Sequence, residues 1–301
     1  MFQIEVLNDN QRKHSLVLKN DASDTFATVS LKHGAHVEYL KFNNIDVIQH
    51  PKQSDYLHNF ASAILFPFTN RIENGVYNFN GKTYTLECNK AGENNAIHGL
   101  VHDKCFALIE SEHTLDYAKV LMRYVENEPI SGFPFKYQID ITYTLFAHQF
   151  LIDISVKNCD TSSFPFALGW HPYFVTSDVF KSKIKFLPKQ HIINNANFVP
   201  ERLESFVENE LYFNDGFYDD CYELKDAKVS FETPEYQIKI ESSSVSNYLQ
   251  VYTNAIEKHL VAIEPMTAPA NCFNNGIDVQ LLQPNESYQL TWKLNFENSY
   301  K

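Results

Sequence analysis

The amino-acid sequence predicts an all-β protein built from large antiparallel sheets, and three observations lead to this expectation. Long segments alternate apolar and polar side chains with a period of two, an Asn-Gly pair separates two β-rich runs, and segments with helical character are few and weak. No repeat, low-complexity stretch or Pro/Gly/Ser-rich linker divides the 301 residues. We therefore expect residues 1–301 to form a single domain.

The sharpest turn signal lies in segment 76–86. Asn80 and Gly81 stand between two short runs that are rich in aromatic and β-branched residues. Both central positions of a tight hairpin turn require positive φ, which Asn and Gly tolerate. The sequence predicts a β-hairpin here.

Four further segments alternate clearly, and they carry most of the fold prediction. Segments 137–145 and 150–156 place apolar side chains at every second position on either side of a short connection. The same alternation returns at 236–240 and at 288–296. Such strands pair antiparallel with one face buried.

Weaker signals complete the assignment of elements. Segment 29–40 opens with a weak strand and a turn at Gly34, and segment 54–60 is a candidate short helix with Ser54 as its N-cap. Segment 203–211 is the remaining competitor for a helix.

Charge and composition narrow the class of partner. The net charge is −12, and a chain that binds phosphate backbones or anionic membranes presents clustered basic side chains instead. The four arginines are scattered: Arg12, Arg71, Arg123 and Arg202. We expect no nucleic-acid partner and no membrane partner, and a neutral small molecule fits better.

The termini and cysteines indicate the compartment. Residues 1–6 contain an early acid and lack a basic start, unlike a signal peptide, and no apolar run approaches the ~20 residues that cross a bilayer. Five cysteines, an odd number, are widely spaced without a C-x-x-C pair. This favours reduced thiols in a soluble cytoplasmic chain.

His171 is the most conspicuous ionisable residue. It lies within the aromatic segment 164–174, between Trp170 and Pro172. An imidazole with an ordinary pKa of about 6.5 holds or releases a proton near neutral pH. The alternative is a core histidine with one hydrogen bond. Trp170 is a candidate for stacking on a ligand, although core packing is the favoured explanation for it.

Two polar segments could meet His171. Asn70 and Arg71 precede the predicted hairpin, and the guanidinium is a planar fork of donors for oxygen ligands, or else a structural arginine paired with an acid such as Glu73. His98 and His102 have the spacing of a helical metal pair, but glycine lies between them and no H-E-x-x-H motif is present. We expect no metal.

Acidic residues supply the remaining candidates. Asp219 and Asp220 form an acid pair that an ordinary turn would also explain. Glu264 interrupts an apolar strand end, where Pro265 is expected to stop the hydrogen-bond ladder. A carboxylate is costly to bury alone, so Glu264 is expected to be either paired or functional.

Four motifs, in order along the chain, resemble those of the aldose 1-epimerases, or mutarotases. They are Asn70-Arg71-Ile72 before the hairpin, Asn95-Ala96-Ile97-His98-Gly99, Trp170-His171-Pro172-Tyr173-Phe174, and Ile263-Glu264-Pro265-Met266-Thr267 followed by Pro269, Asn271 and Phe273. The resemblance implies a galactose mutarotase-like β-supersandwich fold. One departure is Leu100 after Gly99, where many relatives have a second glycine.

The resemblance also implies roles for individual residues. Glu264 would be the general base and His171 the general acid. Substrate would be held by Arg71, His98 and Asp219, with Asn70 beside them and Asp220 as the alternative to Asp219. A nearby acid such as Asp219 would keep His171 protonated, whereas burial would oppose its charge.

The implied activity is that of an isomerase. It would interconvert the α and β anomers of a free aldohexose, such as galactose or glucose, by acid/base ring opening without a cofactor. Two alternatives are a hexose-6-phosphate 1-epimerase, which needs basic residues at the pocket rim, and a non-catalytic sugar-binding module. The expected partner is a small sugar, and the protein is expected to be a monomer or a homodimer.

Overall fold

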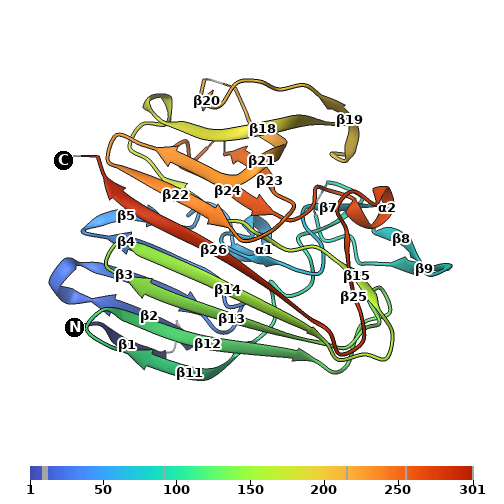
Figure 1. Cartoon of the computed structure of the whole chain (residues 1–301), viewed down its shortest axis with the longest axis horizontal. Helices are drawn as coiled ribbons and strands as arrows, with labels where there is room; N and C mark the ends of the chain where they lie inside the picture. The colour runs from blue at the N-terminus through green and yellow to red at the C-terminus, as the bar shows by residue number, and fades with distance from the viewer. Residues whose placement is uncertain (9–12, 91, 215, 255, 300–301) are drawn as a thin grey trace.

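The computed structural model describes residues 1–8, 13–90, 92–214, 216–254 and 256–299, and strands dominate it (Figure 1). The helical elements of these residues are short: η1 (Asp21–Ser23), α1 (Tyr56–Asn59), η2 (Val179–Lys181) and α2 (Cys272–Asn275). None of the helices in this part of the chain has the length and apolar character needed to span a bilayer.

One layer of the fold is a row of long antiparallel strands that crosses the front of Figure 1. Its strands pair in the order β11 (Ala107–His113), β12 (Tyr117–Glu126), β13 (Tyr137–Phe146), β14 (Gln149–Asn158), β26 (Ser287–Asn298) and β22 (Tyr236–Ser242). The predicted strands at 137–145, 150–156, 236–240 and 288–296 are confirmed.

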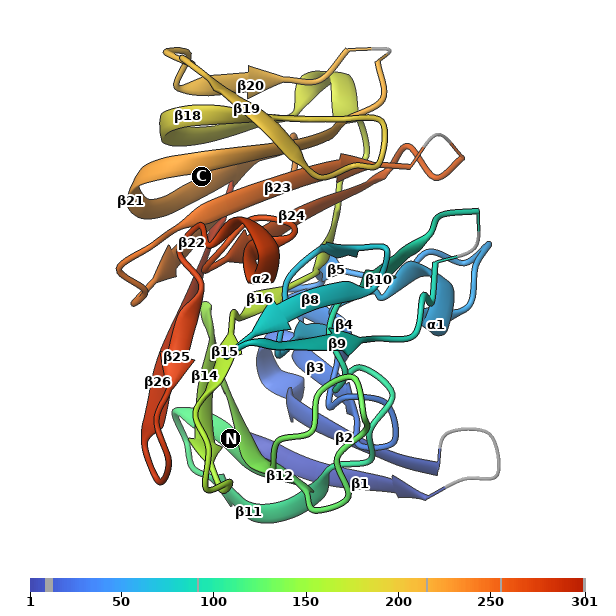
Figure 2. The same ribbon diagram turned by 90° about the vertical axis from the view of Figure 1, so that its right-hand side faces the viewer.

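The second layer lies behind the first (Figures 1 and 2). It pairs β1 (Gln3–Asn8), β2 (Lys13–Asn20), β3 (Thr25–Ser30), β4 (Val37–Phe42), β5 (Ile45–Ile48), β17 (Tyr173–Val175), β24 (Leu260–Met266) and β23 (Tyr248–Thr253). The predicted turn at Gly34 connects β3 and β4, with a φ of 64°.

The long strand β21 (Asp219–Glu232) joins the layers. Its first half pairs with β23 and its second half with β22. On its other edge lies β18 (Lys183–Asn194), which also carries β19 (Pro200–Glu204) and β20 (Glu210–Tyr212). Together with two short strands, Ile64–Leu65 and Gly169–Trp170, these strands form one continuous hydrogen-bonded sheet of twenty strands among the described residues.

Smaller pairings fill one end of the sandwich. They are β6 (Ile64–Leu65) with β16 (Gly169–Trp170), β7 (Arg71–Glu73) with β10 (Asn95–Ile97), β8 (Val76–Phe79) with β9 (Lys82–Thr85), and β15 (Phe164–Phe166) with β25 (Gln280–Leu282). The β8–β9 pair is the predicted hairpin, with Asn80 and Gly81 at φ 49° and 73°.

Aromatic side chains lock the two layers together. The rings of Phe42 and Phe296 stack with centroids 5.1 Å apart, and the Tyr143 hydroxyl donates to the Ala35 carbonyl over 2.8 Å. The buried Tyr236 donates across the sandwich to the Val175 carbonyl at 2.7 Å. Each buried tyrosine thus combines a large apolar contact with a satisfied hydroxyl.

Two predictions about helices require correction. Segment 203–211 is not a helix, because Leu211 pairs with Ile184 and Leu203 with Ile192, so that β18 draws both ends of the segment into strands. The helix predicted at 54–60 shortens to one turn, and its N-cap is Asp55 rather than Ser54. Ser54 instead accepts two hydrogen bonds from the Asn59 amide.

The cysteines contribute no disulfide to this fold. All five are free thiols: Cys88, Cys105 and Cys159 are exposed, and Cys221 and Cys272 are buried.

Candidate functional site

A cavity of about 250 Å³ brings together the six residues that the family resemblance assigned to the site. Its walls come from the α1 segment, the β7 and β10 region, the start of β17, and the adjoining strands β21, β23 and β24. The six predicted residues that line it are Asn70, Arg71, His98, His171, Asp219 and Glu264.

Strand register sets Glu264 and His171 against each other. Gly169 pairs with Met266 and Tyr173 with Ala262, so His171 lies opposite Glu264 in the row between these pairs. The His171 Nε2 atom is 3.3 Å from the Glu264 Oε1 atom. Both side chains are almost fully buried, with 5% and 2% exposed.

The ladder is interrupted where this pair lies. Pro265 does not stop β24 as predicted, because pairing with β23 continues through Leu249–Pro265 to Tyr248–Met266. The Ile263 N–H donates to the Pro172 carbonyl. Backbone N–H groups two residues apart in a strand point to the same side, so an N–H at position 265 would face the same neighbouring strand. There the neighbouring strand is broken between β16 and β17, so the absent N–H of proline costs no ladder bond.

Burial decides the protonation of the pair. Removal from water raises the pKa of Glu264 well above its ordinary value, and the negative Asp219 adds to this effect while Arg71 opposes it. Burial lowers the pKa of His171 to about 4. Of the two opposing effects expected from the sequence, burial therefore prevails over a nearby acid at His171. Both shifts favour a neutral pair, so we expect the pair to hold one proton, on Glu264.

Several buried polar atoms at this pair lack a hydrogen-bond partner among the described residues. They are Glu264 Oε2, His171 Nδ1 and His98 Nδ1. An unsatisfied buried polar atom costs about 1–3 kcal/mol, so native proteins retain few of them.

Arg71 is held by an acid that the sequence did not reveal. Its Nε and Nη2 atoms donate to the Glu93 carboxylate over 2.7 and 3.1 Å. Its Nη1 atom donates to Asn70 Oδ1 at 3.1 Å. Glu73, the predicted alternative partner, instead accepts from the Asn197 amide. This arrangement fixes the plane of the guanidinium while its remaining N–H groups face the cavity region near Asp219.

A chain of hydrogen bonds, closed by an ion pair, orients the amides and the aspartate. Asn70 donates to Gln250 Oε1 at 3.3 Å, and Gln250 donates to Asp219 Oδ1 at 2.7 Å. Asp219 Oδ2 then approaches the Arg71 guanidinium at 3.9 Å. The neighbouring Asp220 pairs with His191 Nε2 at 3.0 Å and does not line this cavity, so Asp219 is the acid that faces it.

His98 is placed by a tight backbone turn. It has a φ of 63°, and its N–H donates to the Asn70 carbonyl at 2.8 Å. Its ring lies edge-on to that of His171, with centroids 4.9 Å apart. Burial, together with the nearby His171 and Arg71, lowers the pKa of His98 well below its ordinary value. A neutral His98 both donates and accepts hydrogen bonds.

Gly99 permits this turn, and its replacement is expected to unfold the loop. A Cβ at Gly99 would lie 2.3 Å from the Phe66 carbonyl oxygen, and its φ is +74°. We expect Gly99→Ala to lower the free energy of unfolding by about 3 kcal/mol or more, measured by urea denaturation. Gly81→Ala is the matched control, because it has a φ of +73° but open space around it. Its expected cost is about 1–2 kcal/mol, and equal losses for both variants would contradict the steric argument.

Trp170 and His102 lie apart from the cavity walls. Trp170 is fully buried and packs edge-on against Phe174, so the core alternative is confirmed for it. His102 packs edge-on against Phe60. Within the described residues no group of three or more His, Cys, Asp or Glu side chains is arranged to hold a metal ion.

Sequence reasoning missed several residues of the cavity. Gln250 lies directly opposite Glu264 on β23, and Tyr252 lies two residues further along the same strand. A buried glutamine in the apolar run 248–253 was the available signal for this strand. Other missed lining residues are Ser54, His58, Asn59, Phe60, Lys90, Ile97, Tyr173 and Asn254.

The fold and this cavity define a galactose mutarotase-like protein. The sequence matches the family described as aldose 1-epimerase over residues 14–295, and the chain belongs to that family. The family resemblance and the predicted all-β supersandwich are thereby confirmed.

Relatives and solved structures agree with this assignment. The uncharacterized protein YihR of Escherichia coli K12 is 27% identical over 289 residues, which cover 91% of each chain. A galactose mutarotase-like protein from Clostridium acetobutylicum superposes with a TM-score of 0.87 at 21% identity, covering 99% of each chain. Galactose 1-epimerase from Lactobacillus acidophilus has a TM-score of 0.80 at 15% identity, covering 100% of this chain and 99% of that one. At these identities the two solved structures establish the shared fold.

Proposed function

We propose that this protein is an aldose 1-epimerase that interconverts the α and β anomers of a free aldohexose such as galactose or glucose. The observation that carries the proposal is the buried Glu264–His171 pair, 3.3 Å apart, at the wall of a cavity with unsatisfied polar atoms. Anomer exchange requires one base and one acid within reach of neighbouring oxygens.

The pair supplies both groups from its single proton. When sugar binds, the proton passes from Glu264 to His171, which leaves a carboxylate and an imidazolium. Glu264 removes the proton of the C1 hydroxyl while His171 protonates the ring oxygen; the bond between C1 and the ring oxygen breaks and an aldehyde forms. Rotation about C1–C2 and the reverse transfers close the ring on its other face. No net proton is consumed, and each transfer contributes about 10²–10⁴ in rate.

The charges around the cavity favour a neutral sugar. Among the described residues that line the cavity, Arg71 and Lys90 are cationic. Arg71 is already paired with Glu93, and Lys90 has no ion-pair partner among the described residues. Recognition of a phosphate generally uses several cationic groups together. A free aldose therefore suits these walls better than a hexose 6-phosphate.

Polarimetry tests the proposal directly. We expect the protein to accelerate the equilibration of freshly dissolved α-D-galactose or α-D-glucose in a weakly catalytic buffer. Acceleration with glucose 6-phosphate alone would favour the phosphosugar alternative. Sugar binding by titration without any acceleration would establish a non-catalytic sugar-binding module instead.

Glu93 is expected to act through the position of Arg71. Glu93→Gln removes the carboxylate charge that pairs with the Arg71 guanidinium, so the guanidinium is less firmly fixed. We expect KM to rise about fivefold to tenfold with kcat within about twofold, as for an interaction made equally in ground and transition states. Glu73→Gln is the control, because Glu73 does not contact Arg71, and its KM should be unchanged. An unaltered KM in Glu93→Gln would contradict this role.

A further inference from the structure

The hairpin of β18 and β19 lies at the top of Figure 1, and its tip, residues 195–199, contacts Arg71. The Phe198 ring covers the guanidinium, with the Arg71 Cζ atom 4.6 Å from the ring centroid. An aromatic face attracts a cation, and the attraction is larger where water is excluded. Arg71 is only 6% exposed. The guanidinium therefore has an aromatic contact in addition to its hydrogen bonds with Glu93 and Asn70.

Two hydrogen bonds hold this hairpin tip against the strands that carry the site. The Asn95 amide donates to the Asn197 carbonyl over 3.0 Å, and the Asn197 amide donates to Glu73 Oε1 over 2.9 Å. Asn95 belongs to β10, and Glu73 belongs to β7, the strand that begins with Arg71. The contact between Phe198 and Arg71 is therefore part of an anchored junction between the hairpin and these two strands.

The backbone at Phe198 has a conformation that aromatic residues rarely adopt. Its φ is 60°, in the left-handed region where glycine and asparagine are favoured. The turn itself is closed by Asn195, whose carbonyl accepts from the Phe198 N–H at 3.0 Å and whose side chain accepts from the Asn197 N–H at 2.8 Å. Residues held in such conformations cluster at functional sites. Glycine would suit this turn better, so the turn does not explain the phenyl ring.

Phe198 acts from outside the Glu264 cavity. It lines a separate cavity of about 150 Å³ together with Glu93, and it is absent from the walls of the Glu264 cavity, which Arg71 lines. Its ring can therefore influence a bound sugar only through Arg71. Asp219, which also approaches the guanidinium, begins β21, the strand paired with β18. Phe198 and Asp219 thus reach Arg71 from the same pair of strands.

We propose that Phe198 is a positioning residue of the sugar site, whose ring keeps the Arg71 guanidinium in the orientation that meets the sugar hydroxyls. The inference rests on the function proposed above, in which Arg71 holds the substrate. An arginine that is fixed before the sugar arrives loses less side-chain freedom on binding, so the ring raises affinity. Arg71 holds the sugar in the ground state and the transition state alike. Loss of the ring should therefore raise KM and leave kcat nearly unchanged.

Two substitutions separate the aromatic face from apolar bulk. Phe198→Leu keeps an apolar side chain without a ring. We expect the Kd for galactose or glucose, measured by titration, and the KM, measured by polarimetry, to rise about fivefold to tenfold, with kcat within twofold. Phe198→Tyr keeps the ring, and all three constants should stay within twofold of the native values. A leucine variant that binds sugar as tightly as the tyrosine variant would contradict the role of the ring.

Phe198→Gly separates the ring from the stability of the hairpin. Glycine adopts a φ of 60° without strain, and this relief offsets the loss of the ring contact. We expect its Tm to stay within about 2 °C of the native value while Kd and KM rise at least as much as in Phe198→Leu. Losses of Tm that parallel the losses of affinity across the leucine, glycine and tyrosine variants would mean that the ring only stabilises the hairpin, and would overturn the proposal.

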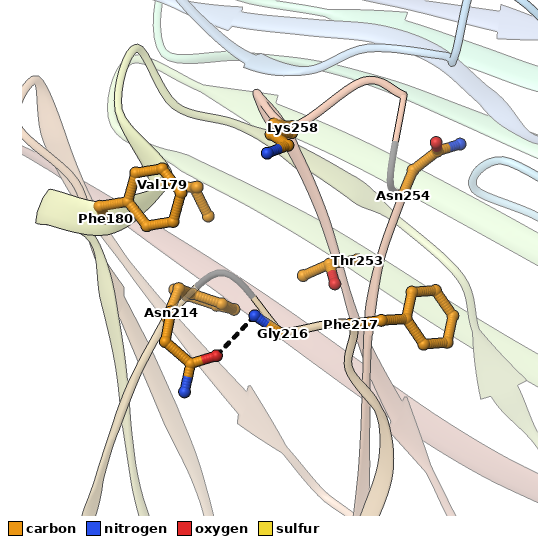
Figure 3. A pocket seen from close by; sticks show the side chains of 9 residues that line it. Val179, Phe180, Asn214, Gly216, Phe217, Thr253, Asn254 and Lys258 are labelled. Atoms are coloured by element: carbon orange, nitrogen blue, oxygen red, sulfur yellow. Dashed lines mark hydrogen bonds between the residues drawn. The ribbon is translucent and has the colours of Figure 1, made fainter.

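Phe180→Leu is the matched control. Phe180 is 49% exposed, compared with 39% for Phe198, and it lies beside Val179 at a different cavity of about 240 Å³ (Figure 3). It does not line the Glu264 cavity. Its replacement should leave Kd, KM and kcat unchanged. A rise in Kd equal to that of Phe198→Leu would show that the effect is not specific to the ring on Arg71.

The Nε–H group of Arg71 gives a readout that does not depend on turnover. Its NMR signal is identified by its absence in Arg71→Lys. In the native protein it should exchange slowly with solvent, because Nε donates to Glu93 at 2.7 Å and the Phe198 ring covers the guanidinium. Exchange should be at least fivefold faster in Phe198→Leu and near native in Phe198→Tyr. A raised Kd in Phe198→Leu with unchanged exchange would overturn the action through Arg71.

The combined measurements distinguish failure of this inference from failure of the proposed function. Native turnover with unchanged Kd and KM in Phe198→Leu would overturn the positioning role and leave the proposed function intact. A native protein that binds sugar without accelerating its equilibration would overturn the proposed activity, and the Kd values of the variants would then decide the role of Phe198. A native protein that neither binds nor turns over sugar would overturn both.

Discussion

Glu264→Gln is expected to lower kcat/KM for anomer exchange by about 10³-fold, because the amide cannot accept the proton of the C1 hydroxyl. The amide has nearly the same shape as the carboxyl group and still reaches His171. It also removes an ionisable group from a site where only 2% of the side chain is exposed, so stability should not fall. Polarimetry and thermal unfolding of the same preparation separate loss of chemistry from loss of fold.

A second buried glutamate provides the control for this substitution. Glu257 is 5% exposed and accepts a hydrogen bond from the Lys52 N–H at 2.9 Å, but it does not line the Glu264 cavity. Glu257→Gln should keep kcat/KM within about twofold. Activity of Glu264→Gln within tenfold of the native protein would refute the role of Glu264 as base.

His171→Asn is expected to lower kcat/KM by about 10²–10³-fold and to change the shape of the pH profile. In the proposed mechanism the active pair carries one proton. Below about pH 4 His171 binds a second proton, so native activity should decline there as pH falls. Above the raised pKa of Glu264 the pair loses its only proton, so activity should also decline at high pH. These limbs belong to the coupled pair and not to either residue alone.

The variant should lack the acidic limb, because the group that binds the second proton is gone. Rates are measured from pH 3 to pH 10 and corrected for the spontaneous acid-catalysed and base-catalysed reaction in each buffer. Since the two residues act as a unit, Glu264→Gln combined with His171→Asn should be only a few times slower than Glu264→Gln alone. An acidic limb that persists unchanged in His171→Asn would exclude the imidazole as its source.

Patterns local in the sequence gave the fold class and most of the strands. The period-two alternation at 137–145 and the Asn80–Gly81 turn depend on neighbouring residues, and both match the structure. The helix prediction for segment 203–211 was wrong because pairing with β18 sets the conformation of this segment. That pairing cannot be seen in the residue pattern of the segment itself.

The candidate site was predictable where side-chain type alone indicates chemistry. Glu264 and His171 stand out as ionisable groups in apolar surroundings. The ion pair of Arg71 with Glu93 and the bridge through Gln250 depend on loops and strands that meet only in three dimensions. The sequence left the protonation of His171 open between a nearby acid and burial, because the extent of burial cannot be measured from sequence; in the structure burial lowers the pKa of His171.

The strand register described above divides the site into two rows. One row crosses three neighbouring positions at Gln250, Glu264 and His171, and the next row, the outer row, contains Tyr252, Ala262 and Tyr173. Because each row is fixed by its own backbone pairings, substitutions in the outer row leave the spacing of the acid and base intact. We expect substitutions at Tyr252 to alter which sugars the protein accepts while leaving the distance between Glu264 and His171 unchanged.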